Sequence, residues 1–138
     1  MNNVLERFET AHQQSFQKAL REIENGKKIS HWMWFIFPQL KGLGLSERSK
    51  YYALGDLEEA QAFLDHPVLG KNLLLISSAL LKLSTKNATA VMGQPDDIKL
   101  HSSMTLFALL ERSDPVFQKV LDKYFDSSKD VKTMQLLA

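Results

Sequence analysis

The sequence contains no cysteine, and this absence excludes several kinds of chemistry at once. The chain has no disulfide framework, no cysteine-ligated zinc or iron–sulfur site and no thiol nucleophile. It also lacks any apolar run near the roughly 18 residues of a membrane-spanning helix. Residues 1–7 lack the apolar core of a signal peptide. We therefore expect a cytoplasmic protein that has no membrane partner.

The chain has almost no excess of charge of either sign. It carries 17 Lys and Arg against 16 Asp and Glu, a net charge of +1. A domain that binds nucleic acid usually has a large basic surplus, so the composition argues against nucleic acid as a partner. The charge is nevertheless uneven, because residues 18–50 hold seven basic and three acidic side chains, a local balance of +4. A basic segment of this size suits a small anion better than a long duplex.

The pattern of apolar residues predicts an all-α fold. The length of 138 residues fits one domain over residues 1–138. Apolar residues recur at three- and four-residue spacings, which is typical of amphipathic helices. Several candidate segments are only one or two turns long, so we expect about six to eight helices in one compact domain. The segments with helical pattern are 4–25, 31–37, 46–54, 57–64, 67–83, 88–92, 95–111, 115–125 and a last short one after Asp130.

Aromatic side chains concentrate in the stretch from Ser30 to Leu40, which holds both tryptophans and two of the eight phenylalanines. Ser30 and Pro38 would begin and end a two-turn helix there. A short buried strand is the alternative, since aromatic residues favour strands. We prefer the helix because no other segment offers a strand partner for the backbone groups.

The same stretch is the first candidate for a binding site. In a helix, His31 and Trp34 would share a face. One interpretation is a core helix whose His31 bonds to a backbone carbonyl. The other is a pocket wall, in which a tryptophan is the platform for a planar ligand and basic side chains supply charge. The candidate ligand-binding residues are Lys27, Lys28, His31, Trp34 and Gln39.

The predicted helix over 95–111 is the second candidate. Lys99, Ser102 and Ser103 are three and four residues apart, so a helix would place them on one face. A serine beside a lysine can act as a nucleophile, but this spacing is common by chance and no orienting group is evident. The hydroxyls of Ser102, Ser103 and Thr105 could instead line a polar pocket or bond to their own helix. No catalytic residue is assigned.

Ser46 is the last candidate, because it follows Gly42-Leu43-Gly44 and could begin a helix whose N-terminal amides hold an anion. The glycines lack the lysine and hydroxyl residue of a phosphate-binding P-loop, and a turn with positive φ explains them as well. The histidines stand at positions 12, 31, 66 and 101, and no pair has the spacing of helical metal ligands. We therefore expect no metal site and no cofactor.

The run from Lys27 to Leu40, followed by Gly42-Leu43-Gly44 and Ser46, closely resembles the signature of the DUF1810 family. The resemblance covers nearly the whole chain and implies a compact helical fold. It implies no activity, because none is assigned to that family. His12 is a departure, since the resemblance leads us to expect glutamine there. Further matching stretches are Tyr52-Ala53, Glu59-Ala60, 64–70, Gly93, 96–100, 102–107, Asp130 and Thr133.

These observations leave two hypotheses for the function and do not decide whether the protein is an enzyme. The first is a pocket with aromatic and polar walls for a small planar or anionic, nucleotide-like ligand. In that hypothesis the aromatic stretch and the helix over 95–111 face each other. The alternative is a protein–protein interaction module with a groove built around the segment His31–Phe35. Exposure of Trp32, Phe35 or Phe37 would favour this alternative.

Overall fold

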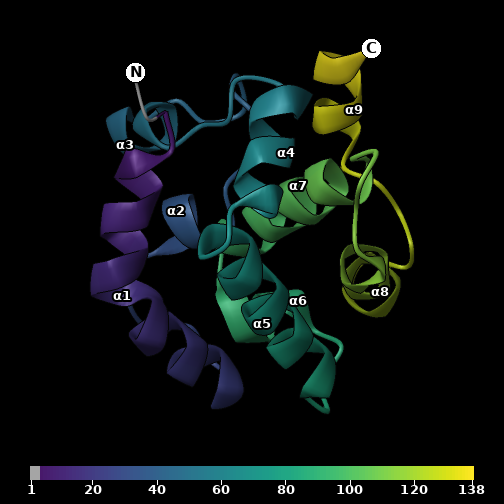
Figure 1. Cartoon of the computed structure of the whole chain (residues 1–138). Coiled ribbons are helices and arrows are strands. Elements are labelled where there is room, and N and C mark those ends of the chain that lie inside the picture. Colours follow the sequence, from purple (N-terminus) through teal and green to yellow (C-terminus); the bar gives the residue numbers. More distant parts are fainter. Residues whose placement is uncertain (1–3) are drawn as a thin grey trace.

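The computed structural model describes residues 4–138, and this part of the chain contains nine helices and no strand (Figure 1). The prediction of an all-α fold is confirmed. There is one helix more than the upper expectation, because three of the helices are only four or five residues long. The helices are α1 (Glu6–Glu24), α2 (Met33–Ile36), α3 (Glu47–Tyr51), α4 (Leu57–Asp65), α5 (Leu69–Lys82), α6 (Ala88–Met92), α7 (Asp96–Ala108), α8 (Pro115–Tyr124) and α9 (Val131–Leu137).

Helix α5 is the centre of the hydrophobic core. Leu73, Ile76 and Leu80 are fully buried, and the helix packs against α1, α4 and α8. Figure 1 shows it between α1 on one side and α8 on the other. An apolar stripe at helical spacing along residues 67–83 accounts for this central place. The stripe does not run all round the helix, however, since Leu75 is 46% exposed.

Helix α1 ends at Glu24, one residue before the predicted limit, and Gly26 is the physical cause. Gly26 has a φ of +83°, a conformation that glycine adopts without steric cost. Its N–H donates to the Ile23 carbonyl, and the N–H of Lys27 donates to the Glu22 carbonyl. This pair of bonds is the Schellman motif, which satisfies carbonyls at the end of a helix. The motif turns the chain back toward α1, so the aromatic stretch runs beside that helix.

Side-chain caps begin several of the other helices where the sequence predicts them. Ser46 accepts a hydrogen bond from the backbone N–H of Ser49, and Asp56 accepts one from Glu59. Asp114 and Asp130 do the same for α8 and α9. Each cap satisfies an N–H that the first turn of a helix leaves without a partner. These caps fix where α3, α4, α8 and α9 start.

The helix predicted over residues 31–37 is shorter than expected. Only Met33–Ile36 is helical, and Ser30 does not cap it. The Ser30 hydroxyl instead donates to the carboxylate of Glu22, 2.7 Å away. His31 therefore lies outside the helix and is exposed, so the prediction that it shares a helical face with Trp34 is wrong.

Two other helices differ from their predicted boundaries. Helix α5 begins at Leu69 and not at the predicted residue 67. The cause is the ring of His66, whose Nδ1 accepts the N–H groups of Val68 and Leu69. Helix α7 ends at Ala108, before the predicted limit. Its first turn leaves Ile98 62% exposed, because Leu100 and Met104 take the face that packs on the core. Among the helices of residues 4–138, none has the length and hydropathy needed to cross a membrane.

His12 is buried and joins three helices. Its Nε2 donates to the carbonyl of Phe35 at 2.8 Å, and the amide of Asn72 donates to its Nδ1 at 3.1 Å. Burial lowers the pKa of His12 to about 4, so the ring is neutral near pH 7. A glutamine amide also offers one donor and one acceptor. The departure from the expected glutamine therefore keeps the same kind of link between α1, α2 and α5.

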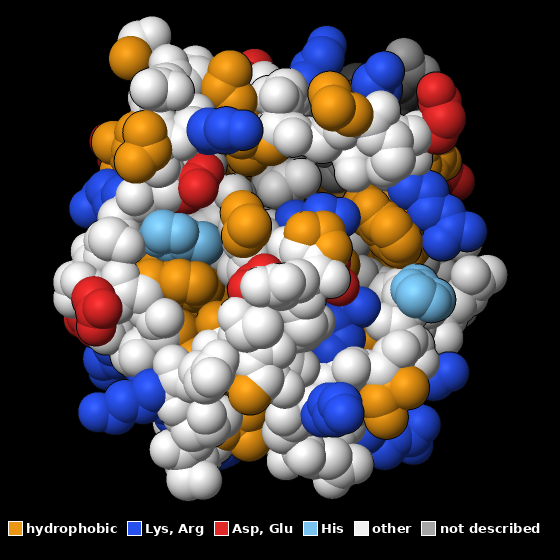
Figure 2. Space-filling view, turned by 180° about the vertical axis from the view of Figure 1, so that it is seen from behind, with side chains coloured by type: hydrophobic (Ala, Val, Ile, Leu, Met, Phe, Trp, Pro, Cys, Tyr) orange, Lys and Arg blue, Asp and Glu red, His pale blue; other side chains and the backbone are white. Residues whose placement is uncertain are grey.

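The surface carries apolar side chains singly or in small groups. Figure 2 shows one face, on which they lie between backbone, neutral and basic side chains, while acidic side chains are fewer. Basic and apolar side chains border a hollow above the middle of this face. Scattered apolar residues of this kind are ordinary for a folded protein. The face in Figure 2 therefore offers no broad apolar patch.

Candidate functional site

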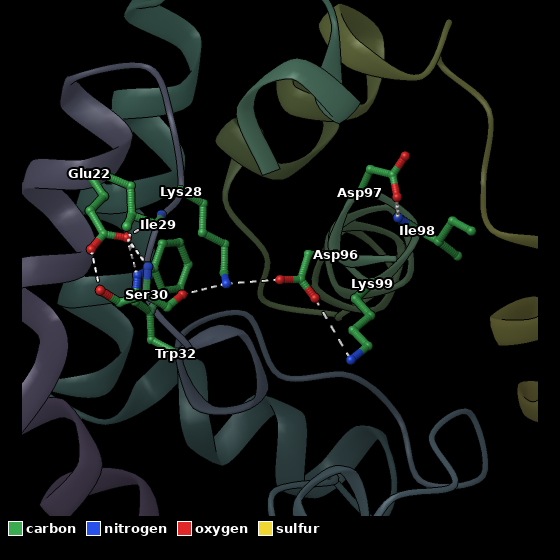
Figure 3. A network of polar contacts seen from close by, with 9 residues as sticks. All are labelled: Glu22, Lys28, Ile29, Ser30, Trp32, Asp96, Asp97, Ile98 and Lys99. Atoms are coloured by element: carbon green, nitrogen blue, oxygen red, sulfur yellow. Dashed lines mark hydrogen bonds and ion pairs between the residues drawn. The ribbon is translucent and has the colours of Figure 1, made fainter. Parts of the chain in front are cut away.

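The aromatic stretch is fixed to α1 through the carboxylate of Glu22, which is 8% exposed. Its Oε1 accepts the N–H groups of Ile29 at 2.8 Å and Ser30 at 2.9 Å. The same oxygen accepts the indole N–H of Trp32 at 2.9 Å. Burial by itself would raise the pKa of Glu22, but the hydrogen bonds from Ser30, Ile29 and Trp32 outweigh it and lower the pKa to about 2. Glu22 is therefore ionised and holds residues 29–32 in place (Figure 3).

Lys28 joins the aromatic stretch to α7. Its Nζ lies 2.9 Å from Oδ2 of Asp96 and donates to the Ser30 carbonyl at 2.6 Å. The side chain is only 6% exposed and lies over the Trp32 ring, 4.9 Å from its centroid. Figure 3 shows it reaching across to Asp96 at the start of α7. All these contacts are structural, so Lys28 is not free to bind a ligand.

Asp96 also contacts Lys99, and this contact leads to Trp34. The Nζ of Lys99 lies 3.8 Å from Oδ1 of Asp96 and 5.4 Å from the centroid of the Trp34 ring. The guanidinium of Arg48 lies 5.2 Å from the same centroid. Cations favour such positions because the face of an aromatic ring carries partial negative charge. The aromatic stretch, α3 and α7 thus meet at Trp34.

A small hollow beside the Trp34 ring has room for about one water molecule, with a volume near 10 Å³. The indole Nε1 of Trp34 is buried, and it has no hydrogen-bond acceptor among residues 4–138. Such donors are rare in native proteins and call for an explanation. Besides the apolar Met33 and Phe37, the hollow is lined by Trp34, Gln39, Ser49, Tyr52 and Lys99. We refer to these five side chains, together with Arg48 on the Trp34 ring, as the Trp34 cluster.

In the loop before α3, the backbone at Gly44 lies close to Ser49 and Gln39, two members of the cluster. A Cβ added to Gly44 would lie 2.2 Å from Cβ of Ser49 and 3.4 Å from Nε2 of Gln39. Only glycine fits there without displacing Ser49. The Ser46 hydroxyl donates to the Ser49 hydroxyl at 2.9 Å. The glycine and the Ser46 cap therefore place Ser49 at the hollow.

The cluster is rich in hydrogen-bond donors and positive charge. It presents the indole of Trp34, the guanidinium of Arg48 and the ammonium of Lys99, besides amide and hydroxyl groups. Within residues 4–138, Arg48 forms no ion pair with a carboxylate. Burial and Tyr51 raise the pKa of Tyr52 despite the opposing charges of Arg48 and Arg7, so its hydroxyl keeps its proton. This donor set suits an anion.

The structure brings together three of the residues expected at a site, namely Trp34, Gln39 and Lys99. Lys27 and His31 are exposed and do not line this hollow. The Ser46 hydroxyl acts as a helix cap next to Ser49. Sequence reasoning missed Arg48, Ser49 and Tyr52 as members. The sequence places Arg48 beside an anion only at the start of the helix that Ser46 begins, and no pattern connects α3 with Trp34.

The hydroxyl groups of α7 that were candidates for a polar pocket make other contacts in the structure. Ser102 donates to Oδ2 of Asp130 at 3.0 Å, and Thr105 accepts the N–H of Asp130 at 2.9 Å. These two side chains fasten the start of α9 to α7. Ser103 is fully buried, and its hydroxyl has no partner among the described residues. The α7 hydroxyls therefore do not line the hollow beside Trp34.

The alternative hypothesis expects a groove with exposed aromatic side chains, but these side chains are buried in the structure. Trp32 and Phe37 are 1% exposed, and Phe35 is 8% exposed. All three belong to the hydrophobic core. The aromatic stretch is therefore mainly a core segment, from which Trp34 and Gln39 reach the cluster.

These features define a small all-α protein with one hydrophobic core and a cluster of cations around a tryptophan. The chain belongs to the family described as protein of unknown function (DUF1810), whose model matches residues 2–137. The resemblance read from the aromatic stretch is thereby confirmed. The fold is similar to the crystal structure of the conserved hypothetical protein Rv1873 from Mycobacterium tuberculosis, with a TM-score of 0.93 and 40% identity over 96% of this chain and 95% of that chain. No curated protein matches the chain.

Proposed function

We propose that the protein binds a small anionic ligand through the Trp34 cluster, by a phosphate or carboxylate group. The observation that carries the proposal is the buried indole N–H of Trp34, which has no acceptor among residues 4–138. Two cations, Arg48 and Lys99, lie over the ring that carries this N–H. A buried donor without a partner costs about 1–3 kcal/mol. An anionic oxygen would remove that cost and would also neutralise the charge of Arg48.

The size of the hollow limits how the ligand binds. A volume near 10 Å³ accepts one oxygen atom in the place of a water molecule. The rest of the anionic group would lie at the mouth, between Arg48 and Lys99. A planar ligand would have to compete with these two cations for the Trp34 ring. The geometry therefore supports an anion rather than a stacked ring.

The proposal is for binding and assigns no reaction. The donors of the cluster can hold negative charge, but Asp96 contacts both Lys28 and Lys99 and is not free to act as a base. Ser103, the buried hydroxyl on α7, does not line the hollow. The role of Asp96 in the proposal is to position Lys99 beside the indole ring.

Isothermal titration with inorganic phosphate at constant ionic strength tests the proposal. We expect saturable binding, and we expect Arg48→Ala to weaken it about tenfold, because charge-assisted hydrogen bonds are the strong ones. Lys50→Ala is the matched control, since it removes an exposed cation of the same helix that does not line the hollow. Equal affinities for the two variants, or no binding by the unmodified protein, would contradict the proposal.

A further inference from the structure

A second hollow lies against the Trp34 cluster, between α1 and the end of α3. It is open to solvent and has a volume of about 530 Å³. Sites for small molecules usually occupy about 300–1,000 Å³. The polar groups that line it come from Glu6, Arg7, Thr10 and Gln14 on α1 and from Tyr51 and Tyr52 at the end of α3. This second hollow, which we call the groove, has the volume for a small molecule that the hollow beside Trp34 lacks.

Tyr52 connects the two hollows, because its side chain lines both of them. Its ring packs on Phe8 of α1, with the ring centroids 5.7 Å apart, and on Phe35, with the centroids 5.2 Å apart. Tyr52 is therefore shared by the two hollows, and a ligand held in both would have to pass its side chain.

Arg7 fixes this geometry. Its Nε donates to the Tyr51 carbonyl at 2.7 Å, and its guanidinium also bonds to the Ala53 carbonyl and to Glu59. The end of α3 is thereby held against α1. Because these bonds occupy the guanidinium of Arg7, we place the anionic group at the Trp34 cluster and not at Arg7.

We propose that the ligand is a phosphorylated sugar, whose phosphate binds the Trp34 cluster and whose hydroxyl groups lie in the groove beside Tyr51. This inference rests on the proposed function. The groove offers the chemistry that sugar hydroxyls need: the amide of Gln14 donates and accepts, the Thr10 hydroxyl does both, and the Glu6 carboxylate accepts. The ring of Tyr51 is 59% exposed and can cover the apolar C–H face of a sugar.

Titration with ribose 5-phosphate, inorganic phosphate and ribose tests the inference on the whole chain. We expect ribose 5-phosphate to bind about tenfold more tightly than inorganic phosphate, since one or two extra hydrogen bonds give that factor. Gln14→Ala should reduce the affinity for ribose 5-phosphate to that for inorganic phosphate and leave the phosphate affinity unchanged. The matched control is Gln13→Ala, which alters an exposed neighbour on α1 that does not line the groove.

The outcomes separate this inference from the proposed function. If inorganic phosphate binds and ribose 5-phosphate binds no more tightly, the sugar inference is wrong and the anion site stands. If Gln14→Ala and Gln13→Ala behave alike, the groove does not hold the sugar. If neither phosphate compound binds, the anion site itself is wrong. Binding of ribose alone with the same affinity as ribose 5-phosphate would also overturn the inference.

Discussion

Glu22→Ala should lower the free energy of unfolding by about 4 kcal/mol, since it leaves several buried donors without an acceptor. The backbone N–H groups of Ile29 and Ser30 and the indole N–H of Trp32 all bond to this carboxylate in the structure. Urea unfolding at pH 7 measures the change. The control is Glu24→Ala, which removes an exposed carboxylate from the same helix. Equal stabilities of the two variants would show that Glu22 does not hold the aromatic stretch.

The same carboxylate should make the protein sensitive to acid. Its pKa falls from an ordinary value of 4.5 to about 2 in the folded state, so the unfolded chain takes up the proton first. Stability is therefore fully present above about pH 5 and decreases as the pH drops toward 2, by about 3 kcal/mol. Glu22→Gln has no such group and should lose less stability over this range. His12 is present in both proteins, so its titration does not affect the comparison.

Gly70→Ala should prevent stable folding or cost more than about 3 kcal/mol, because a methyl group has no space there. A Cβ added to Gly70 would lie 1.8 Å from the backbone oxygen of Leu64. Backbone atoms cannot move aside as a flexible side chain does, so α5 would have to separate from the end of α4. The yield of folded protein and the urea midpoint measure the effect.

Gly55→Ala is the matched control for this substitution. A Cβ on Gly55 would meet only the side chain of Glu59, at an ordinary distance of 3.7 Å. We expect this variant to keep its stability within about 0.5 kcal/mol, as is usual for surface substitutions. If Gly70→Ala is as stable as Gly55→Ala, the close packing of α4 on α5 is not as described.

Local signals in the sequence predicted the helices well. Helices α4 and α8 begin at the predicted residues, where Asp56 and Asp114 cap them, because capping depends on side chains within a few residues of the helix start. Gly26 ends α1 for the same local reason. The apolar stripe of α5 agrees with its central place, since a helix with that much apolar surface is surrounded by others.

Local signals of this kind do not reveal contacts between segments that are distant in the sequence. Ser30 looked like a helix cap, but its hydroxyl donates to the carboxylate of Glu22 on the neighbouring helix, and the helix begins only at Met33. The pairing of Lys28 with Asp96 spans 68 positions and has no local pattern. For the same reason the sequence predicted Trp34 and Lys99 at one site but did not reveal that Arg48 lies beside the same ring.

The indole N–H signals of the two tryptophans test the anion site most directly. In a ¹⁵N-labelled sample, Trp34→Phe identifies one signal, and the Trp32 signal is an internal reference because Glu22 already accepts its proton. As inorganic phosphate is added at constant ionic strength, we expect the Trp34 signal to shift and saturate while the Trp32 signal stays in place. A Trp34 signal that does not move, or two signals that drift together without saturation, would contradict the proposal that this indole donates to a bound anion.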